Sequence, residues 1–197
     1  MTKLIDFDAY TDGAKRTESH REPSTASLTN FMDALMLANL AAELLDLYKK
    51  DLFYGRGIDA AKREEILTHM ANTINGAAGP NDLPTDPGVP NVNPRLLHAV
   101  IGKFTEAGEM IQALGEAIET GNLDIVNLAE EVGDDKWYDA LLLDELKKLS
   151  GGSITIDRIL QTNLDKLAAR YPEKFEGRLA ITRDLDTERA ILERVAS

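Results

Sequence analysis

Four acidic side chains occur as two evenly spaced pairs in the second half of the chain. Glu106 and Glu109 lie three residues apart within FTEAGEM, and Glu131 and Asp134 lie three residues apart within EEVGDDKWY. Residues at this spacing point from one face of a helix. Converging carboxylates repel one another and lose hydration unless a cation neutralises them. Because the chain has no cysteine and these ligands are hard oxygens, the pattern indicates a site for Mg²⁺, with Mn²⁺ as a substitute, rather than Zn²⁺.

The same spacing also occurs on solvated acidic surfaces, and this is the simpler alternative. The chain has 34 acidic residues and a net charge of −12, so some acid pairs are expected from composition alone. Two features favour the cation site. Gly108 and Gly133 lie inside the pairs, where helix propensity favours alanine by roughly 1 kcal/mol. Apolar residues expected in a core also follow each pair, which indicates that the acids lie close to a core edge.

Two long helices are expected to carry these pairs. Apolar residues recur at helical spacing over Arg95–Glu119 and again over Leu123–Leu149, and the Gly121–Asn122 pair separates the two segments. Helices joined by so short a turn pack antiparallel. The two acid pairs are therefore expected to face each other.

The rest of the chain also has helical patterns, and no segment alternates as a strand does. The sequence predicts an all-α protein, a single domain over residues 1–197. Residues 76–94 hold five of the seven prolines and are expected to form a loop. Residues 28–75 are expected to form an extra N-terminal helical hairpin. The further expected helices are a short one near Asp8–Thr17, then Leu28–Lys50, Ile58–Ile74, Thr155–Arg170 and Thr187–Val195.

Composition limits the classes of function. A net charge of −12 repels polyanions and argues against nucleic-acid binding, whereas a bound cation would still allow a small anionic substrate. No window approaches the roughly 18 apolar residues of a membrane helix, and the first residues do not form a signal peptide. We therefore expect a cytoplasmic protein that binds neither nucleic acid nor a membrane.

The ordered set of motifs resembles a known enzyme family. LLHAVIGKFTEAGEM followed by NLAEEVGDDKWYDALLL is similar to the E-E-x-x-E, spacer, E-x-x-D signature of MazG-like nucleoside triphosphate pyrophosphohydrolases, which belong to the all-α NTP pyrophosphatase superfamily. YTDGAKRT near the N-terminus and RILQTNLDKLAARYPEKFEG near the C-terminus are similar to the corresponding parts of phage-type members. The resemblance covers about the first 17 residues and everything after Pro94.

This resemblance implies a helical bundle that hydrolyses a nucleoside or deoxynucleoside triphosphate, with Mg²⁺, to the monophosphate and pyrophosphate. It places the catalytic and metal-binding acids at Glu106, Glu109, Glu131 and Asp134. The family's first glutamate corresponds to Thr105, which leaves the number of metal ions and the identity of the general base open. It also implies a homodimer or homotetramer, because short members complete the bundle with partner chains, and a phage-encoded member would work in the host cytoplasm.

A basic helix face is a candidate for substrate binding. Asn163, Lys166 and Arg170 recur at three- and four-residue steps and so share one face of the expected helix. Lysine and arginine bind phosphate oxygens, and the resemblance places this segment near the active site. A surface stripe that pairs with neighbouring acids is an equally good interpretation.

Lys136 and Trp137 are also candidates because they follow the second acid pair closely. Trp137 could stack on a nucleobase, although a single tryptophan at helical spacing is more often part of a core.

Residues 28–75 have two interpretations. ANLAAELLDLYKKDLFYGRGID resembles the stretch that contains and follows the family's glutamate motif, with Glu43 in the place of Glu109 but Leu40 in the place of Glu106. This segment is either a degenerate first copy of the motif or an inserted helical hairpin.

Two other kinds of protein would also be all-α with inward acids. A carboxylate-bridged di-iron protein needs E-x-x-H pairs, and His20, His69 and His98 form none. A non-catalytic helical scaffold or adaptor is the main alternative, and it predicts that alanine at each of the four acids would cause no loss of activity.

Overall fold

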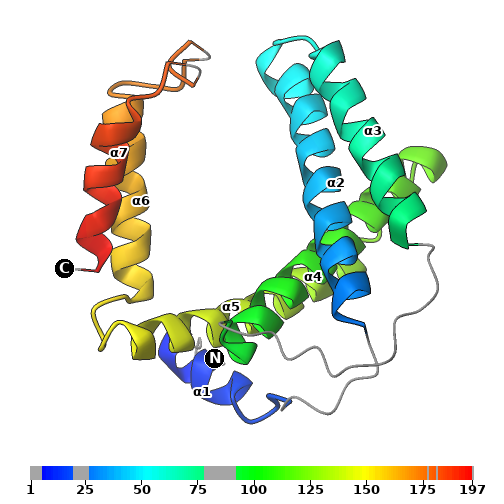
Figure 1. Ribbon diagram of the computed structural model, residues 1–197. Coiled ribbons are helices and arrows are strands. Elements are labelled where there is room, and N and C mark those ends of the chain that lie inside the picture. The colour runs from blue at the N-terminus through cyan, green and yellow to red at the C-terminus, as the bar shows by residue number, and fades with distance from the viewer. Residues whose placement is uncertain (1–5, 20–26, 78–91, 177, 181, 197) are drawn as a thin grey trace. The chain divides into compact units, whose positions relative to one another are not determined.

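The computed structural model describes residues 6–19, 27–77, 92–176, 178–180 and 182–196. All regular secondary structure within these ranges is helical, which confirms the all-α prediction for this part of the chain (Figure 1). The helices are α1 (Phe7–Ala14), α2 (Leu28–Tyr54), α3 (Ala60–Ala77), α4 (Pro94–Thr120), α5 (Ile125–Leu149), α6 (Ile156–Arg170) and α7 (Leu185–Leu192), and a 3₁₀ turn, η1 (Glu193–Val195), follows α7.

The chain divides into two compact units. The first consists of Met1–His20 together with Val92–Ser197 and contains α1, α4, α5, α6 and α7, and the second consists of Arg21–Asn91 and contains α2 and α3.

The two helices that carry the acid pairs begin and end within two residues of the predicted positions: α4 is one residue longer at each end, and α5 begins two residues later. Asn93 caps α4 by accepting hydrogen bonds from the backbone of Arg95 and Leu96, and Pro94 occupies the first helical position, where its fixed φ is favourable. Gly121, with a φ of 75°, ends α4. Asp124 then caps α5, so only a short turn separates the helices.

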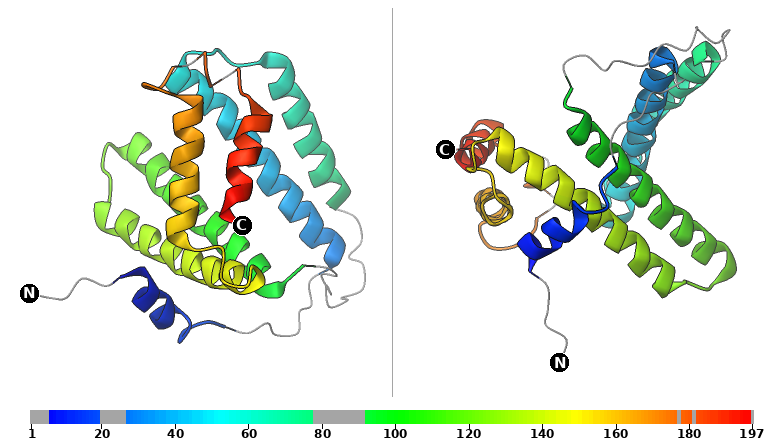
Figure 2. Two further views of the ribbon diagram at one scale, coloured as in Figure 1. Left: turned by 90° about the vertical axis from the view of Figure 1, so that its left-hand side faces the viewer. Right: turned by 90° about the horizontal axis from the view of Figure 1, so that it is seen from below.

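The helices α4 and α5 pack side by side and antiparallel (Figure 2). Ala99 of α4 and Ala140 and Leu141 of α5 are fully buried. Lys103 of α4 forms ion pairs with Asp135 at 2.5 Å and Asp139 at 2.6 Å on α5. These ion pairs, together with the small buried residues, fix the register of the two helices.

A second ion-pair cluster lies near the start of α4. Arg95 contacts Asp144 at 2.5 Å and Glu145 at 3.1 Å on α5, and Glu18 at 2.5 Å in the segment after α1. The arginine therefore connects three segments that are far apart in the sequence.

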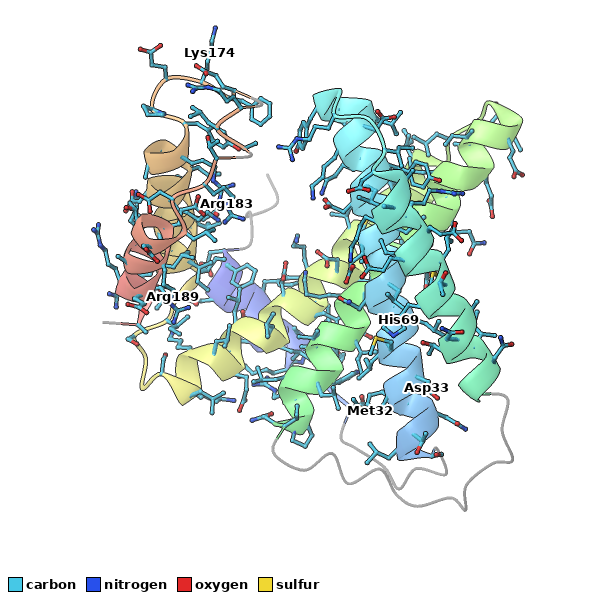
Figure 3. The ribbon with its side chains drawn as sticks, turned by 45° about the horizontal axis from the view of Figure 1, so that its top comes forward. Met32, Asp33, His69, Lys174, Arg183 and Arg189 are labelled. Atoms are coloured by element: carbon cyan, nitrogen blue, oxygen red, sulfur yellow. The ribbon has the colours of Figure 1, made fainter. Side chains whose placement is uncertain are left out.

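The helices α6 and α7 form a hairpin (Figure 2). The buried carboxylate of Glu188 on α7 closes it. Glu188 accepts hydrogen bonds from Arg170 at the end of α6 and from Arg183, which is labelled in Figure 3 and lies in the segment that leads into α7. The helix α7 begins two residues earlier than the sequence predicts, because Asp184 caps it through the backbone N–H of Thr187.

In the second unit, α2 and α3 form a hairpin in which Leu40 and Ile66 are buried. The helix α2 runs four residues beyond the predicted end, to Tyr54, where Gly55 with a φ of 61° stops it. The helix α3 includes Gly76 and Ala77, which were expected in the loop, and the loop residues 78–91 lie outside the described part of the chain. The two interpretations of residues 28–75, a degenerate repeat and an inserted hairpin, both stay predictions.

The helix α2 is, by length and composition alone, apolar enough to cross a membrane, although no window of the sequence was expected to approach such a span. Core helices of soluble proteins and signal sequences share this property, so it is weak support for a membrane span.

Candidate metal centre

Three of the four predicted acids converge between α4 and α5. Carboxylate oxygens of Glu106, Glu109 and Glu131 all lie within 4.8 Å of one another. Glu131 is only 7% exposed, Glu106 is half-buried and Glu109 is exposed. The three-residue spacing on α4 and the antiparallel packing of α5 together produce this arrangement. We call these three residues the carboxylate trio.

Asp134 lies outside the trio but remains close to it. Its side chain is exposed, and its oxygens do not join the mutual 4.8 Å group. Burial, followed by the charges of Glu109 and Asp134, raises the pKa of Glu106. The fourth predicted acid therefore contributes to the electrostatic field of the trio without belonging to its tightest cluster.

The electrostatics of Glu131 are similar. Burial, and then the charge of Glu109 and a hydrogen bond with it, raise the pKa of Glu131. Raised pKa values mean that the carboxylates bind protons more tightly in the absence of another cation. A divalent cation at this point would supply the missing positive charge and would favour the ionised form.

The neighbouring carboxylates of α5 have a different environment. Asp135 and Asp139 pair with lysines, and Asp144 and Glu145 pair with Arg95. Within the described ranges, by contrast, no lysine or arginine forms an ion pair with any member of the trio. The trio thus combines a buried carboxylate with the absence of a cationic partner in the described chain, and its hard oxygen ligands fit Mg²⁺ or Mn²⁺.

A cavity of about 620 Å³ adjoins the trio and extends toward the turn between α4 and α5. Glu109 and Glu131 line its inner end. The remaining lining includes three more acids and no lysine or arginine, so a polyphosphate could enter only together with cations. The other lining residues are Gln112, Ala113, Glu116, Glu119, Thr120, Asn122, Asp124 and Asn127.

Another cavity, of about 600 Å³, lies between α1, the end of α5 and the start of α6. It contains none of the predicted site residues. Of these two cavities, the one beside the trio is the one that predicted site residues line, namely Glu109 and Glu131.

The two candidates that follow the acid pair on α5 make contacts within the protein. Lys136 forms ion pairs with Asp135 at 2.7 Å and with Asp139 at 2.6 Å. The indole N–H of Trp137 donates a hydrogen bond of 2.9 Å to the hydroxyl of Thr17, and its ring packs edge-on against Tyr138. These contacts give both side chains structural roles, and their predicted roles in substrate binding stay predictions.

The three candidates on α6 are not placed beside the trio by any described contact. The helix α6 packs against α7 and η1. Arg170 is held by Glu188 at 2.8 Å, Asn163 is exposed and Lys166 is half-buried. Their roles as phosphate ligands also stay predictions.

Two tyrosines near the acids were missed as individual candidates. The hydroxyl of Tyr10 donates to the backbone oxygen of Gly133 at 3.2 Å, and burial and then the charge of Asp134 raise its pKa. Burial and then the charge of Glu106 raise the pKa of Tyr138. The four-residue step from Asp134 to Tyr138 was a usable signal, whereas the approach of Tyr10 is a long-range contact with no local signal.

No protein-family model matches this chain, and no curated protein or solved structure matches it either. The MazG-like resemblance therefore depends on the motifs themselves.

Proposed function

We propose that this protein is a Mg²⁺-dependent nucleoside triphosphate pyrophosphohydrolase with a fold of the all-α NTP pyrophosphatase type. The observation that carries the proposal is the carboxylate trio, in which the buried Glu131 faces two other acids and, among the residues that the structure describes, has no lysine or arginine partner. Leaving such carboxylates uncompensated is unfavourable for the fold. A bound divalent cation explains the arrangement, and the order of the sequence motifs supports the enzyme class.

The reaction is NTP + H₂O giving NMP and pyrophosphate. The oxygen of a water molecule attacks the α-phosphorus, and the bond to the oxygen that bridges the α- and β-phosphates breaks. Mg²⁺, when bound, would neutralise the phosphate oxygens and lower the pKa of the attacking water. Glu106, Glu109 and Glu131 would hold the cation, and Asp134, which lies just outside the trio, would serve as a further ligand or accept the proton of the water.

The substrate-binding part of the proposal assigns the nucleotide to the predicted residues beyond the acids. Lys136 and Trp137 follow Asp134 by two and three residues, and Asn163, Lys166 and Arg170 share one face of α6. We also infer a cytoplasmic location, where nucleoside triphosphates and Mg²⁺ are abundant.

Self-association belongs to the same proposal. The helix α4 has a stripe of exposed apolar side chains at helical spacing, and exposed stripes of this kind are typical of helix–helix interfaces. We therefore infer a homodimer or homotetramer, which size-exclusion chromatography with light scattering would test. The stripe consists of Val100, Phe104, Ile111, Leu114 and Ile118.

The experiment that tests the activity measures pyrophosphate release from each canonical NTP and dNTP, with Mg²⁺ or Mn²⁺ and with EDTA. The wild type is compared with Glu109→Gln and Asp134→Ala, and with Glu64→Gln as a control. Glu64 is an exposed glutamate of α3 that lines neither cavity. We expect metal-dependent hydrolysis that Glu109→Gln and Asp134→Ala abolish and that Glu64→Gln preserves.

Full turnover by both site variants would show that the site is wrong. No pyrophosphate release by the wild type with any of these substrates would favour the alternative, a non-catalytic helical scaffold or adaptor.

A further inference from the structure

The N-terminal segment that contains α1 lies against α5 and is held there by contacts between residues distant in sequence. Lys15 pairs with Asp144 at 3.4 Å, and Thr17 accepts the hydrogen bond of the Trp137 indole. Ala14 is buried. The segment is therefore an integral part of the unit that carries the acids.

One contact of this segment reaches the acid pair itself. Tyr10 donates its phenolic proton to the backbone oxygen of Gly133, which lies between Glu131 and Asp134. The distance is 3.2 Å, and the two residues are 123 positions apart. The phenol also lies in the field of Asp134, which together with burial favours its protonated form and so keeps it a donor.

We propose that Tyr10 is a positioning residue for the carboxylate site and acts through the backbone at Gly133. This proposal rests on the proposed function, because it assumes that Glu131 and its neighbours hold a cation. Mg²⁺ requires nearly ideal octahedral geometry, so small displacements of the turn that carries Glu131 and Asp134 weaken binding. A hydrogen bond from a separate helix to this turn limits such displacements.

Removing the Tyr10 hydroxyl is expected to weaken metal binding as the loss of other residues that support metal ligands does, without touching the cation itself. Loss of such partners typically weakens metal affinity or activity by about 10- to 100-fold. Because the Tyr10 contact goes to the backbone rather than to a ligand oxygen, we expect a change near the lower end, about tenfold.

The test compares Tyr10→Phe with Lys15→Gln. The first change removes only the hydroxyl and keeps the packed ring. The second weakens another contact between the α1 segment and α5, eleven residues further along α5 from Gly133. Mn²⁺ affinity is measured on each folded, full-length protein by titration with Mn²⁺ alone, followed by kcat and KM for the best triphosphate substrate.

We expect Tyr10→Phe to raise the Kd for Mn²⁺ about tenfold and to lower kcat/KM similarly, while Lys15→Gln retains wild-type values for both. A purely structural role predicts equal effects from the two variants, and that result would overturn the proposal. An unchanged Kd in Tyr10→Phe would overturn it as well.

Glu109→Gln in the same titration separates this proposal from the proposed function. If wild type and Glu109→Gln bind Mn²⁺ alike, the carboxylate site itself is wrong and the role of Tyr10 falls with it. If only Glu109→Gln loses Mn²⁺, while Tyr10→Phe binds as wild type does, the site stands and the role of Tyr10 is wrong.

Discussion

Gly102 of α4 lies directly against the ring of Tyr138 of α5. A Cβ at residue 102 would overlap the Cε1, Cζ and Cδ1 atoms of that ring. Gly102 precedes Glu106 by one helical turn, and Tyr138 follows Asp134 by one turn. The close contact therefore lies next to both acid pairs and sets how near their two helices can approach.

Gly102→Ala is expected to lower the free energy of unfolding by about 1–3 kcal/mol, because the tyrosine ring must move and the helices must separate. Urea denaturation measures this change. Gly115→Ala is the control on the same helix, since a Cβ there meets no atom within 4 Å. We expect it to stabilise the fold by about 0.5–1 kcal/mol through helix propensity. Equal effects of the two substitutions would contradict the close packing at Gly102.

Mg²⁺ is expected to raise the melting temperature of the wild type, because the trio binds it in the folded state only. In EDTA, Glu131→Gln is expected to melt above the wild type, since it removes a buried charge that faces Glu106 and Glu109. With saturating Mg²⁺ the order should reverse. Thermal melts of both proteins with EDTA and with Mg²⁺ measure this.

Glu64→Gln of α3 should follow the wild type in both conditions, because its side chain is exposed and lies outside both the trio and the cavity beside it. A Mg²⁺ shift in Glu131→Gln as large as that of the wild type would contradict a cation site at the trio.

Much of the fold was predictable because its signals are local. The C-terminal end of α4 follows from Gly121, and the start of α5 follows from its capping residue, Asp124. Apolar periodicity alone indicated the helices themselves. The early start of α7 came from the side chain of Asp184, a cap three residues before the predicted first residue, Thr187.

The candidate site was predictable only in part. Three-residue spacing put Glu106 and Glu109 on one face, but the rotation of α5 about its axis decides that Glu131 joins them more closely than Asp134 does. The register of α4 against α5 decides which acidic residues form an ion pair with a lysine or arginine, as Asp135 does with Lys103. Gly108, which the sequence suggested was special, has open space around it, so packing does not explain it.

The α6–α7 hairpin is expected to lose stability at acidic pH. The guanidinium groups of Arg170 and Arg183 hold the pKa of Glu188 at about 2, below its ordinary value of 4.5. A depressed carboxyl pKa stabilises the fold above pH 4.5, and this contribution is lost as the pH falls from 4.5 to 2. Glu188→Gln should therefore lower the free energy of unfolding by about 1–2 kcal/mol at pH 7, a value reduced for solvent screening at the half-exposed Arg183.

Denaturation at a series of pH values from 2 to 7 tests this, and the difference between wild type and Glu188→Gln should disappear near pH 2. Glu193→Gln is the control, because its ion pair with Arg189, the residue labelled in Figure 3, is exposed at both ends. We expect that control to change stability by less than about 0.5 kcal/mol. A constant difference across the pH range would contradict the role of Glu188.

Three glutamine substitutions, two on α6 and one just beyond it, separate a structural role of the basic face of α6 from a role in substrate binding. Arg170→Gln should lower the melting temperature, because it removes a partner of the buried Glu188.

Lys166 has no ion-pair partner in the described part of the chain. If it binds a phosphate oxygen, Lys166→Gln should reduce kcat/KM by about 10- to 100-fold and leave the melting temperature unchanged. Lys174→Gln, at an exposed position beyond α6 (Figure 3), should change neither. Equal turnover by Lys166→Gln and Lys174→Gln would show that the basic face of α6 is a surface stripe. The phosphate contacts would then have to come from residues outside α6 and outside the cavity beside the trio, because the lining of that cavity contains no lysine or arginine.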